Sequence, residues 1–200
     1  GADRGVGFAL CEEFAAHGFR VLAGQYMPEW GALAELAEKY PGQVECILLD
    51  VSDTASVQEA VRTASELVDR IDILVNSAGI PCRNVAETQS YEDWMLVMDS
   101  DLNGPFWLMH ECVRLSMKER QYGKIINIAS IHAFVSRLGY NTNAYCAAKG
   151  GLLMLTKSLA QEWAKYNITV NGIAPGYFPS ELTGAYIDAP AFKKVCEDYS

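Results

Sequence analysis

A tyrosine and a lysine one helical turn apart could carry proton chemistry. Tyr145 and Lys149 stand four residues apart in a helix expected over residues 143–166, so both side chains project from one face. A phenol has an ordinary pKa of about 10, and a neighbouring positive charge favours its ionised form. The pair could therefore act as an acid or base near working pH. Taken alone, it could equally be an ordinary surface pair.

Two further polar residues could complete a catalytic set. Ser130 directly follows a strand expected over residues 125–129 and could donate a hydrogen bond to a substrate oxygen. Asn103 lies in a helix expected over residues 91–117, where a polar residue followed by Gly104 interrupts an apolar face and could hold a water molecule. The candidate catalytic residues are Asn103, Ser130, Tyr145 and Lys149.

The amino-terminal glycines have the spacing of an anion-binding turn. A GxxxGxG pattern precedes a helical run over residues 8–17. Such a turn lets the backbone approach a pyrophosphate while the helix directs its first N–H groups at the anion. A glycine-rich helix start without any ligand is the alternative. The candidate binding residues here are Gly1, Arg4, Gly5, Val6 and Gly7.

Two other segments that follow expected strands could contact the same ligand. Asp50 and Val51 stand where a carboxylate could accept a hydrogen bond from an adenine amino group, although Asp50 could equally cap a helix with residues 52 and 53. Asn76, Ala78 and Gly79 are small enough to let a cofactor pass close over a sheet, or they form an ordinary turn.

Apolar runs alternate along the chain with segments of helical period. Strands are expected over residues 19–23, 44–49, 71–75, 124–128 and 168–173, and helices over 30–40, 55–68, 91–117 and 143–166. The strands are apolar throughout, which indicates that helices cover both faces of the sheet. We therefore predict an α/β fold with a doubly wound, Rossmann-like parallel sheet in three α/β/α layers. Ligands then collect at the carboxyl ends of the strands.

The two ends of the sequence break this pattern. No strand precedes the turn at Gly1, and residues 191–200 have a helical pattern with no closing strand after them. A doubly wound sheet without its first strand would expose two long edges. We expect residues 1–200 to form a single domain that is a slice of a longer subunit.

Composition narrows the classes of partner. The 200 residues are 50% hydrophobic and carry a net charge of −9, which disfavours nucleic acid and anionic membranes as partners. No apolar run reaches the length of about 20 residues that a membrane span needs. The six cysteines and three histidines lack metal-ligand spacing, so no metal is expected. Several cysteines lie in apolar runs, which favours free thiols over disulfides and a cytoplasmic protein.

Together, these residues resemble the classical short-chain dehydrogenase/reductase family across essentially the whole chain. The family's glycine turn matches Gly1, Gly5 and Gly7, its NAG-type element matches Asn76, Ala78 and Gly79, and its catalytic tetrad matches Asn103, Ser130, Tyr145 and Lys149. Its post-strand element matches Pro175 and Gly176, with Phe178 and Ser180 where the family contacts the nicotinamide carboxamide. Ser77 departs from the family's usual asparagine, and the interval from Ser130 to Tyr145 is longer than usual.

The resemblance implies an NAD(P)(H)-dependent oxidoreductase that interconverts a secondary alcohol and a ketone. Tyr145 would donate the proton to the carbonyl oxygen and Ser130 would hydrogen-bond that oxygen. Lys149 would bind the nicotinamide ribose and lower the pKa of Tyr145, and Asn103 would hold a water that reconnects Lys149 to solvent. The long helices would form the interface of a homotetramer or homodimer.

Cofactor preference depends on residues near the end of the second expected strand of the family fold. NAD-preferring relatives usually place an aspartate where Gln25 stands, and relatives that prefer NADP carry a basic residue at the position of Arg4. We therefore favour NADP(H) over NAD(H). Tyr26 argues the other way, because an arginine there would have settled the preference.

The substrate is the least determined feature. The segment after Ser130 and the segment after Pro175 resemble gluconate 5-dehydrogenases and related sugar-acid or polyol dehydrogenases. His132 and Tyr177 are candidate substrate contacts, although aromatic rings in such loops often serve packing alone. The alternative is a reductase of 3-oxoacyl groups on an acidic carrier protein, which the negative net charge disfavours. A non-catalytic nucleotide-binding scaffold is a more remote alternative.

Overall fold

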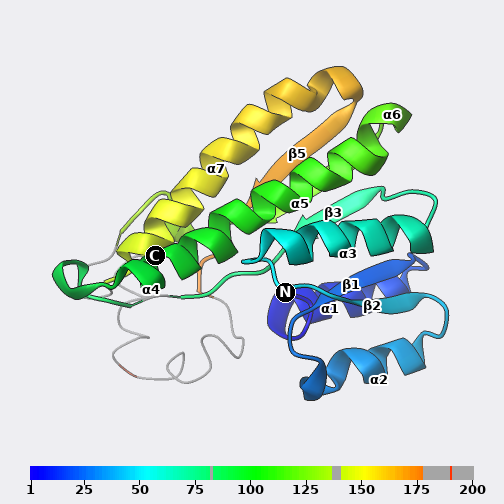
Figure 1. The fold of residues 1–200 in the computed structure, drawn as a ribbon, viewed down its shortest axis with the longest axis horizontal. Helices are drawn as coiled ribbons and strands as arrows, with labels where there is room; N and C mark the ends of the chain where they lie inside the picture. Colours follow the sequence, from blue (N-terminus) through cyan, green and yellow to red (C-terminus); the bar gives the residue numbers. More distant parts are fainter. Residues whose placement is uncertain (82, 137–140, 178–189, 191–200) are drawn as a thin grey trace.

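The computed structural model describes residues 1–81, 83–136, 141–177 and 190, and it has the predicted alternation of strands and helices (Figure 1). The strands are β1 (Val21–Gln25), β2 (Val44–Leu48), β3 (Ile73–Asn76), β4 (Gly123–Ile128) and β5 (Ile168–Ile173). The helices are α1 (Gly5–Ala16), α2 (Ala32–Lys39), α3 (Thr54–Leu67), α4 (Tyr91–Met98), α5 (Gly104–Cys112), α6 (Lys118–Arg120) and α7 (Asn143–Trp163). The helical pattern expected over residues 191–200 lies outside the described residues.

All strand pairs are parallel, but the strands form two sheets. β1 pairs with β2, and β4 lies between β3 and β5. The prediction of a parallel, Rossmann-like α/β fold is thus confirmed. A cavity of about 810 Å³ separates the sheets and is lined by residues of β1 and β3, by the first two residues of the chain and by α1 and α3. Within the described residues, no strand lies between β1 and β3 on the two sides of this cavity.

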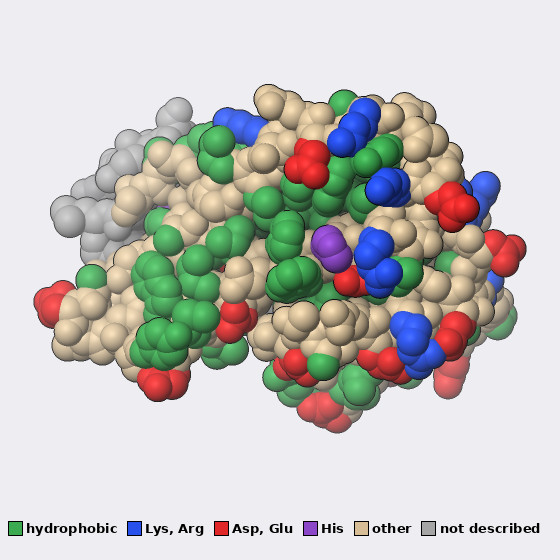
Figure 2. Space-filling view, turned by 45° about the horizontal axis from the view of Figure 1, so that its top comes forward, with side chains coloured by type: hydrophobic (Ala, Val, Ile, Leu, Met, Phe, Trp, Pro, Cys, Tyr) green, Lys and Arg blue, Asp and Glu red, His purple; other side chains and the backbone are tan. Residues whose placement is uncertain are grey.

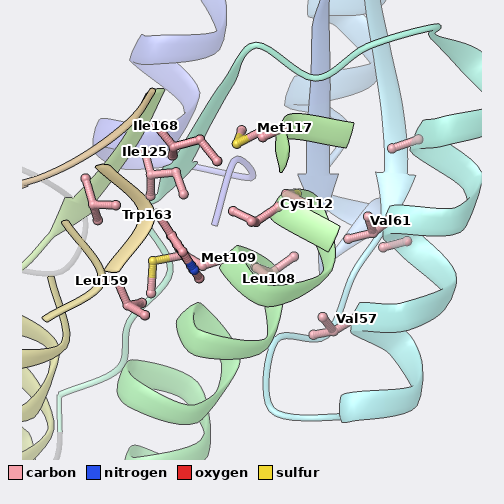
Figure 3. Close-up of a cluster of buried hydrophobic side chains, with 14 of the residues drawn as sticks. Val57, Val61, Leu108, Met109, Cys112, Met117, Ile125, Leu159, Trp163 and Ile168 are labelled. Atoms are coloured by element: carbon pink, nitrogen blue, oxygen red, sulfur yellow. The ribbon is translucent and has the colours of Figure 1, made fainter. Parts of the chain in front are cut away.

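Helices cover the sheets and enclose two main cores. α3 packs against α5, α7 lies along β5 and also contacts α4, and α1 and α2 pack on β1 and β2 (Figure 1). The larger core joins α3, α5 and α7 to the strands, and Figure 3 shows its side chains converging from these elements. The stripe expected on α3 is buried as predicted, with Val57, Ala60, Val61 and Ala64 inside. The smaller core lies between α1, α2 and the β1–β2 sheet.

The helix expected over residues 91–117 is interrupted twice by wider, π-helical turns. The first, η3, covers Asp99–Asn103, and the second, η4, covers Val113–Met117. Pro105 has no N–H to donate to the carbonyl of Asp101, and its ring crowds that carbonyl, so the helix widens just before it. This local widening sets the orientation of the side chains that approach α7.

The described residues include no helix that is long and apolar enough to cross a membrane. Within the same residues, no group of three or more histidine, cysteine, aspartate or glutamate side chains could hold a metal ion. The described cysteines Cys11, Cys46, Cys112 and Cys146 are free thiols.

Candidate active site

The carboxyl end of β4 and the start of α7 bring three of the predicted catalytic residues together. Ser130 follows β4 and is buried, and its Oγ accepts a hydrogen bond from the His132 backbone N–H at 3.1 Å. The Ser130 side chain also hydrogen-bonds the Tyr145 side chain. Lys149 lies one turn further along α7, with its Nζ 5.6 Å from the Tyr145 ring centroid. Ser130, Tyr145 and Lys149 are therefore adjacent, as the sequence predicts.

Lys149 is held by two oxygen atoms inside the protein. Its Nζ donates to the Ile128 carbonyl oxygen at 3.1 Å and lies 3.2 Å from Oδ2 of Asp101. The exposed fractions of the Lys149 and Asp101 side chains are 4% and 0%, so this ion pair is buried. The sequence analysis did not select Asp101.

The Asn103 side chain hydrogen-bonds within its own helix, and the water-holding role expected for it stays a prediction. Its Nδ2 donates to Oδ1 of Asp99 at 2.7 Å, and its side chain shows no polar contact with Lys149 or Tyr145 among the described residues. The wide turn of η3 directs Asp101 toward α7 in its place. Pro105 is the sequence signal that could have shown this, because a proline within a helix displaces the carbonyl four residues earlier.

Asp101 is fixed from both sides. Its Oδ1 accepts a hydrogen bond from the Ile80 backbone N–H at 2.8 Å, and burial raises its pKa while the Lys149 ammonium acts in the opposite direction. A Cβ atom added to Gly79 would lie 2.8 Å from Asp101 Oδ2 and 3.2 Å from Lys149 Nζ. Gly79 therefore makes room for the ion pair, a function beyond the cofactor contact predicted for it.

The environment of Tyr145 differs from the expected one. Burial raises the pKa of Tyr145 to about 12, although the hydrogen bond with Ser130 lowers it, and the negative charge of Asp101 raises it further. The family resemblance implied that Lys149 would lower this pKa. Asp101 Oδ2 lies 3.2 Å from Lys149 Nζ, so a negative charge accompanies the Lys149 ammonium in this site.

The glycine turn packs tightly against the end of β3. A Cβ atom on Gly1 would lie 2.6 Å from the Ala78 backbone nitrogen, and one on Gly7 would collide with the Gly1 carbonyl oxygen. Gly5 opens α1 with φ of 58°, in the left-handed region that favours glycine. The first turn of α1, which includes Val6, has no acidic residue and no side-chain cap.

The end of β1 holds the residues that bear on cofactor preference. The Asp3 carboxylate accepts hydrogen bonds from the backbone N–H groups of Tyr26 and Met27, both at 3.0 Å. The Arg4 guanidinium lies 4.7 Å from the Trp30 ring centroid, and Arg4 is exposed. Gln25 is the last residue of β1. Asp3 and Trp30 were not selected from the sequence.

Asp50 and Asn76 both make internal hydrogen bonds. Oδ1 of Asp50 accepts from the backbone N–H and the hydroxyl of Ser52, whereas Asp53 provides the cap of α3. Val51 packs against the larger core. Asn76 Nδ2 donates to Asn127 Oδ1 at 2.8 Å.

The amide of Asn127 extends this contact across the core. Its Nδ2 donates to Thr156 Oγ1 at 2.9 Å, which links β3, β4 and α7 through buried polar groups. Neither Asn127 nor Thr156 was selected from the sequence. Asn127 lies within β4 and Thr156 within α7, and no local motif distinguishes either residue from its neighbours.

Of the two candidate substrate residues, His132 lies beside Tyr145, and Tyr177 lies beside His132. The His132 ring is 6.1 Å from the Tyr145 ring and 6.3 Å from the Tyr177 ring, both in edge-to-face arrangements. The Pro175 carbonyl accepts a hydrogen bond from the Ile131 backbone N–H at 3.0 Å, which brings the segment after β5 to this rim. Gly176 is exposed. Phe178 and Ser180 lie outside the described residues.

Comparison with known proteins identifies the arrangement. The family model for short chain dehydrogenases matches residues 1–190. The chain is 38% identical over 186 residues to 2-dehydro-3-deoxy-D-gluconate 5-dehydrogenase of Formosa agariphila, covering 92% of this chain and 69% of that protein. It is 36% identical over 189 residues to the 3-oxoacyl-(acyl-carrier-protein) reductase FabG of Escherichia coli, covering 94% and 75%. The chain belongs to the short-chain dehydrogenase family.

A solved short-chain dehydrogenase supports the same assignment. A gluconate 5-dehydrogenase from Burkholderia cenocepacia, crystallised with NADP and tartrate, aligns with a TM-score of 0.88 and 35% identity, covering 98% of this chain and 77% of that one. The protein is thus a dehydrogenase/reductase acting on CH–OH groups. This sets aside the alternative of a non-catalytic scaffold.

Short-chain dehydrogenases use NAD(P), and the residues present fit a dinucleotide. The glycines let the first turn lie directly against neighbouring backbone, where a Cβ atom would collide, and the uncapped start of α1 offers N–H groups to an anion. Gly1 and Ala78 are in close contact, so the glycine turn and the segment after β3 form one continuous surface. That surface leads from the turn toward Gly79 and Lys149.

Proposed function

We propose that this short-chain dehydrogenase interconverts a secondary alcohol and a ketone on a sugar acid or polyol. The observation that carries the substrate class is the His132 ring beside Tyr145, with the polar-edged Tyr177 ring next to it. Nδ1 of His132 lies 3.2 Å from the Val135 carbonyl oxygen, which can only accept, so this nitrogen donates. Nε2 then remains to accept a hydrogen bond from a substrate hydroxyl, or to donate to a carboxylate when the ring is protonated.

Tyr145, Ser130 and Lys149 have different roles in the reaction. A bound nicotinamide supplies or accepts the hydride. In reduction, the Tyr145 hydroxyl donates its proton to the carbonyl oxygen, and Ser130 hydrogen-bonds the same oxygen as negative charge develops there. Lys149 orients the cofactor ribose. In alcohol oxidation, Tyr145 accepts the hydroxyl proton.

The charges near the end of β1 favour NADP(H) over NAD(H). Arg4 is exposed and stacks on Trp30, which limits the side-chain freedom lost when a 2′-phosphate binds. The nearby carboxylate of Asp3 is turned inward onto two backbone N–H groups. Gln25 has no charge to repel a phosphate. The Burkholderia cenocepacia relative crystallised with NADP is in line with this preference.

A second candidate function is reduction of 3-oxoacyl groups on a carrier protein. The 36% identity to FabG of Escherichia coli favours it, and this identity is close to that with the gluconate-type relative. The net charge of −9 opposes it, because an acidic carrier would be repelled unless it met a local basic patch.

The test is the absorbance of reduced nicotinamide with a panel of substrates. Purified enzyme is mixed with NADPH or NADH and with keto-sugar acids, keto-polyols or 3-oxoacyl thioesters. The proposal expects turnover with a keto-sugar acid or keto-polyol, faster with NADPH than with NADH. Turnover restricted to oxoacyl thioesters would contradict the substrate proposal and support the second candidate.

We also propose that the active form is a homotetramer or homodimer of cytoplasmic origin. Large apolar side chains are exposed on neighbouring helices, and Figure 2 shows hydrophobic side chains gathered on one face of the molecule. Those on α4, α5, η4 and α7 are Tyr91, Trp94, Leu96, Trp107, Leu115 and Met154. The free thiols are in line with a reducing compartment. Light scattering of the purified protein tests the assembly.

A further inference from the structure

A fully buried carboxylate, that of Asp101, lies inside the candidate active site. It contacts Lys149, the lysine beside the acid/base tyrosine. Asp101 Oδ2 is 3.2 Å from Lys149 Nζ, and both side chains are almost completely removed from solvent. Burying two charges sacrifices the hydration of both, and their attraction compensates only when the geometry is well supported. A neutral side chain at residue 101 would avoid this cost, so the presence of a charge there requires an explanation.

One backbone group contacts each partner of the ion pair. The Ile80 N–H donates to Asp101 Oδ1 at 2.8 Å, and the Ile128 carbonyl accepts from Lys149 Nζ at 3.1 Å. Gly79 leaves the space that both charged groups occupy, since a Cβ there would approach each of them closely. Three separate segments, after β3, in η3 and at the end of β4, thus converge on one ammonium.

We propose that Asp101 is a positioning residue of the reaction: its carboxylate holds the Lys149 ammonium against the Ile128 carbonyl and neutralises the positive charge that would otherwise act on the Tyr145 hydroxyl. The inference rests on the proposed role of Tyr145 as the proton donor and acceptor. It does not depend on which carbonyl compound is the substrate.

The charged and titratable groups around Tyr145 come from three elements. Asp101 approaches from η3, Lys149 and Cys146 from α7, and His132 from the short helix after β4, with its ring 6.1 Å away. Asp101 and Lys149 together carry no net charge when both are ionised. The neighbourhood therefore offers little stabilisation to a phenolate, apart from the hydrogen bond with Ser130.

This arrangement sets the pH at which each direction of the reaction is fastest. Reduction requires Tyr145 with its proton, which then goes to the substrate oxygen, and Tyr145 later regains a proton from solvent. Oxidation requires the ionised phenol to accept a proton. An enzyme cannot change the equilibrium between alcohol and ketone, so the effect of Asp101 is to keep reduction fast through neutral pH and to move the rise of oxidation to alkaline pH.

The experiment follows the ionisation of Tyr145 in the cofactor-free protein. Tyrosine labelled with ¹³C at Cζ is incorporated, the Tyr145 resonance is assigned by its loss in Tyr145→Phe, and its shift is followed against pH by NMR. Asp101→Asn keeps the size of the side chain and an oxygen that can accept from Ile80. We expect the Tyr145 midpoint to fall by about one pH unit in Asp101→Asn, because the Lys149 charge is no longer offset.

Asp99→Asn is the matched control. It removes one negative charge from the same wide turn, but Asp99 contacts Asn103 and not Lys149. We expect the Tyr145 midpoint to stay at its wild-type value in this variant. An unchanged midpoint in Asp101→Asn, or an equal fall in both variants, would overturn the proposal.

Two further readouts separate positioning from a purely structural role. If Asp101→Asn does not fold by circular dichroism, Asp101→Ser replaces it, since it also removes the charge and its side chain is small enough for the same space. With a working substrate, the alkaline rise of alcohol oxidation should move to lower pH in the folded variant while KM for the alcohol stays unchanged. Failure of the whole substrate panel would count against the proposed function, whereas the NMR midpoint would still decide the role of Asp101.

Discussion

The two ends of the site are built in different ways. At the dinucleotide end, the structure depends on backbone approach: Gly1 lies against Ala78, Gly7 lies against Gly1, and α1 opens without a side-chain cap. At the catalytic end, it depends on buried polar side chains that reach across elements, above all Asp101 with Lys149 and Asn76 with Asn127. One end is therefore sensitive to any added atom, and the other to the loss of a particular charge or amide.

This difference has consequences for how each end tolerates change. A close backbone approach is lost when even a methyl group is added, because the added atom collides with neighbouring backbone. It involves no charged group and needs no partner side chain elsewhere in the sequence. A buried polar pair tolerates changes of shape only if both partners remain satisfied, because an orphaned group loses its hydration without compensation. Substitutions at the dinucleotide end should therefore change cofactor affinity, whereas those at the catalytic end should change kcat or stability.

The largest effect is expected at the catalytic end, from removal of a single hydroxyl. Tyr145→Phe should lower kcat by about 10²- to 10⁴-fold, the usual loss for a positioned acid or base, because no other group occupies its place beside Ser130. NADPH binding, measured by fluorescence, should be unchanged. Tyr91→Phe removes a hydroxyl from a side chain that is 72% exposed and should leave kcat unaltered. Half of the wild-type kcat in Tyr145→Phe would contradict the assignment.

The contrast between the two ends also explains what could be predicted from the sequence. Local spacing reveals Gly1, Gly5 and Gly7, because a backbone turn is encoded within a few residues. It also reveals Tyr145 and Lys149, which are one helical turn apart. The parallel α/β fold follows from the apolar strands.

Partners that are distant in the sequence could not be predicted in this way. Asp101 faces Lys149 only because the helix before Pro105 widens, and regular helical periodicity does not include that displacement. A polar residue followed by glycine, together with the family resemblance, led to Asn103, whose side chain hydrogen-bonds Asp99. Asn127 and Thr156 meet through strand order and helix packing, which no local motif records.

A second prediction tests the buried polar side chains through stability. Asn127→Leu removes the amide that joins Asn76 to Thr156 and leaves both neighbours without their partner. The free energy of unfolding in urea should fall by about 1–3 kcal/mol, the usual penalty for orphaned buried polar groups. Asn171→Leu alters an exposed amide on the neighbouring strand β5 and should change stability by less than about 0.5 kcal/mol. Equal stability of the two variants would mean that the buried network does not hold the sheet and α7 together.

A third prediction tests the backbone approach at the dinucleotide end. Gly7→Ala places a Cβ against the Gly1 carbonyl, so the turn must shift. NADPH affinity should weaken by roughly thirtyfold, which corresponds to a packing cost of about 2 kcal/mol. Gly150→Ala makes the same substitution in α7, where a Cβ would lie 3.8 Å from the nearest atom, and should bind NADPH normally. Normal NADPH binding by Gly7→Ala would show that the turn is not where the dinucleotide lies.

The smallest effect is expected from Arg4, at the dinucleotide end. This residue is an exception to the contrast between the two ends, because it acts through a charged side chain and not through backbone approach. Arg4 acts through its charge, yet it is exposed and stacked on Trp30, so solvent weakens its interaction with a phosphate. Arg4→Ala should weaken NADPH binding by about tenfold, the value of one charge-assisted hydrogen bond, and leave NADH binding unchanged. Arg20→Ala removes another exposed arginine, one that pairs with Glu45, and should affect neither cofactor. An equal loss for NADPH and NADH would mean that Arg4 supports the turn itself, and that this end of the site is controlled by backbone geometry alone.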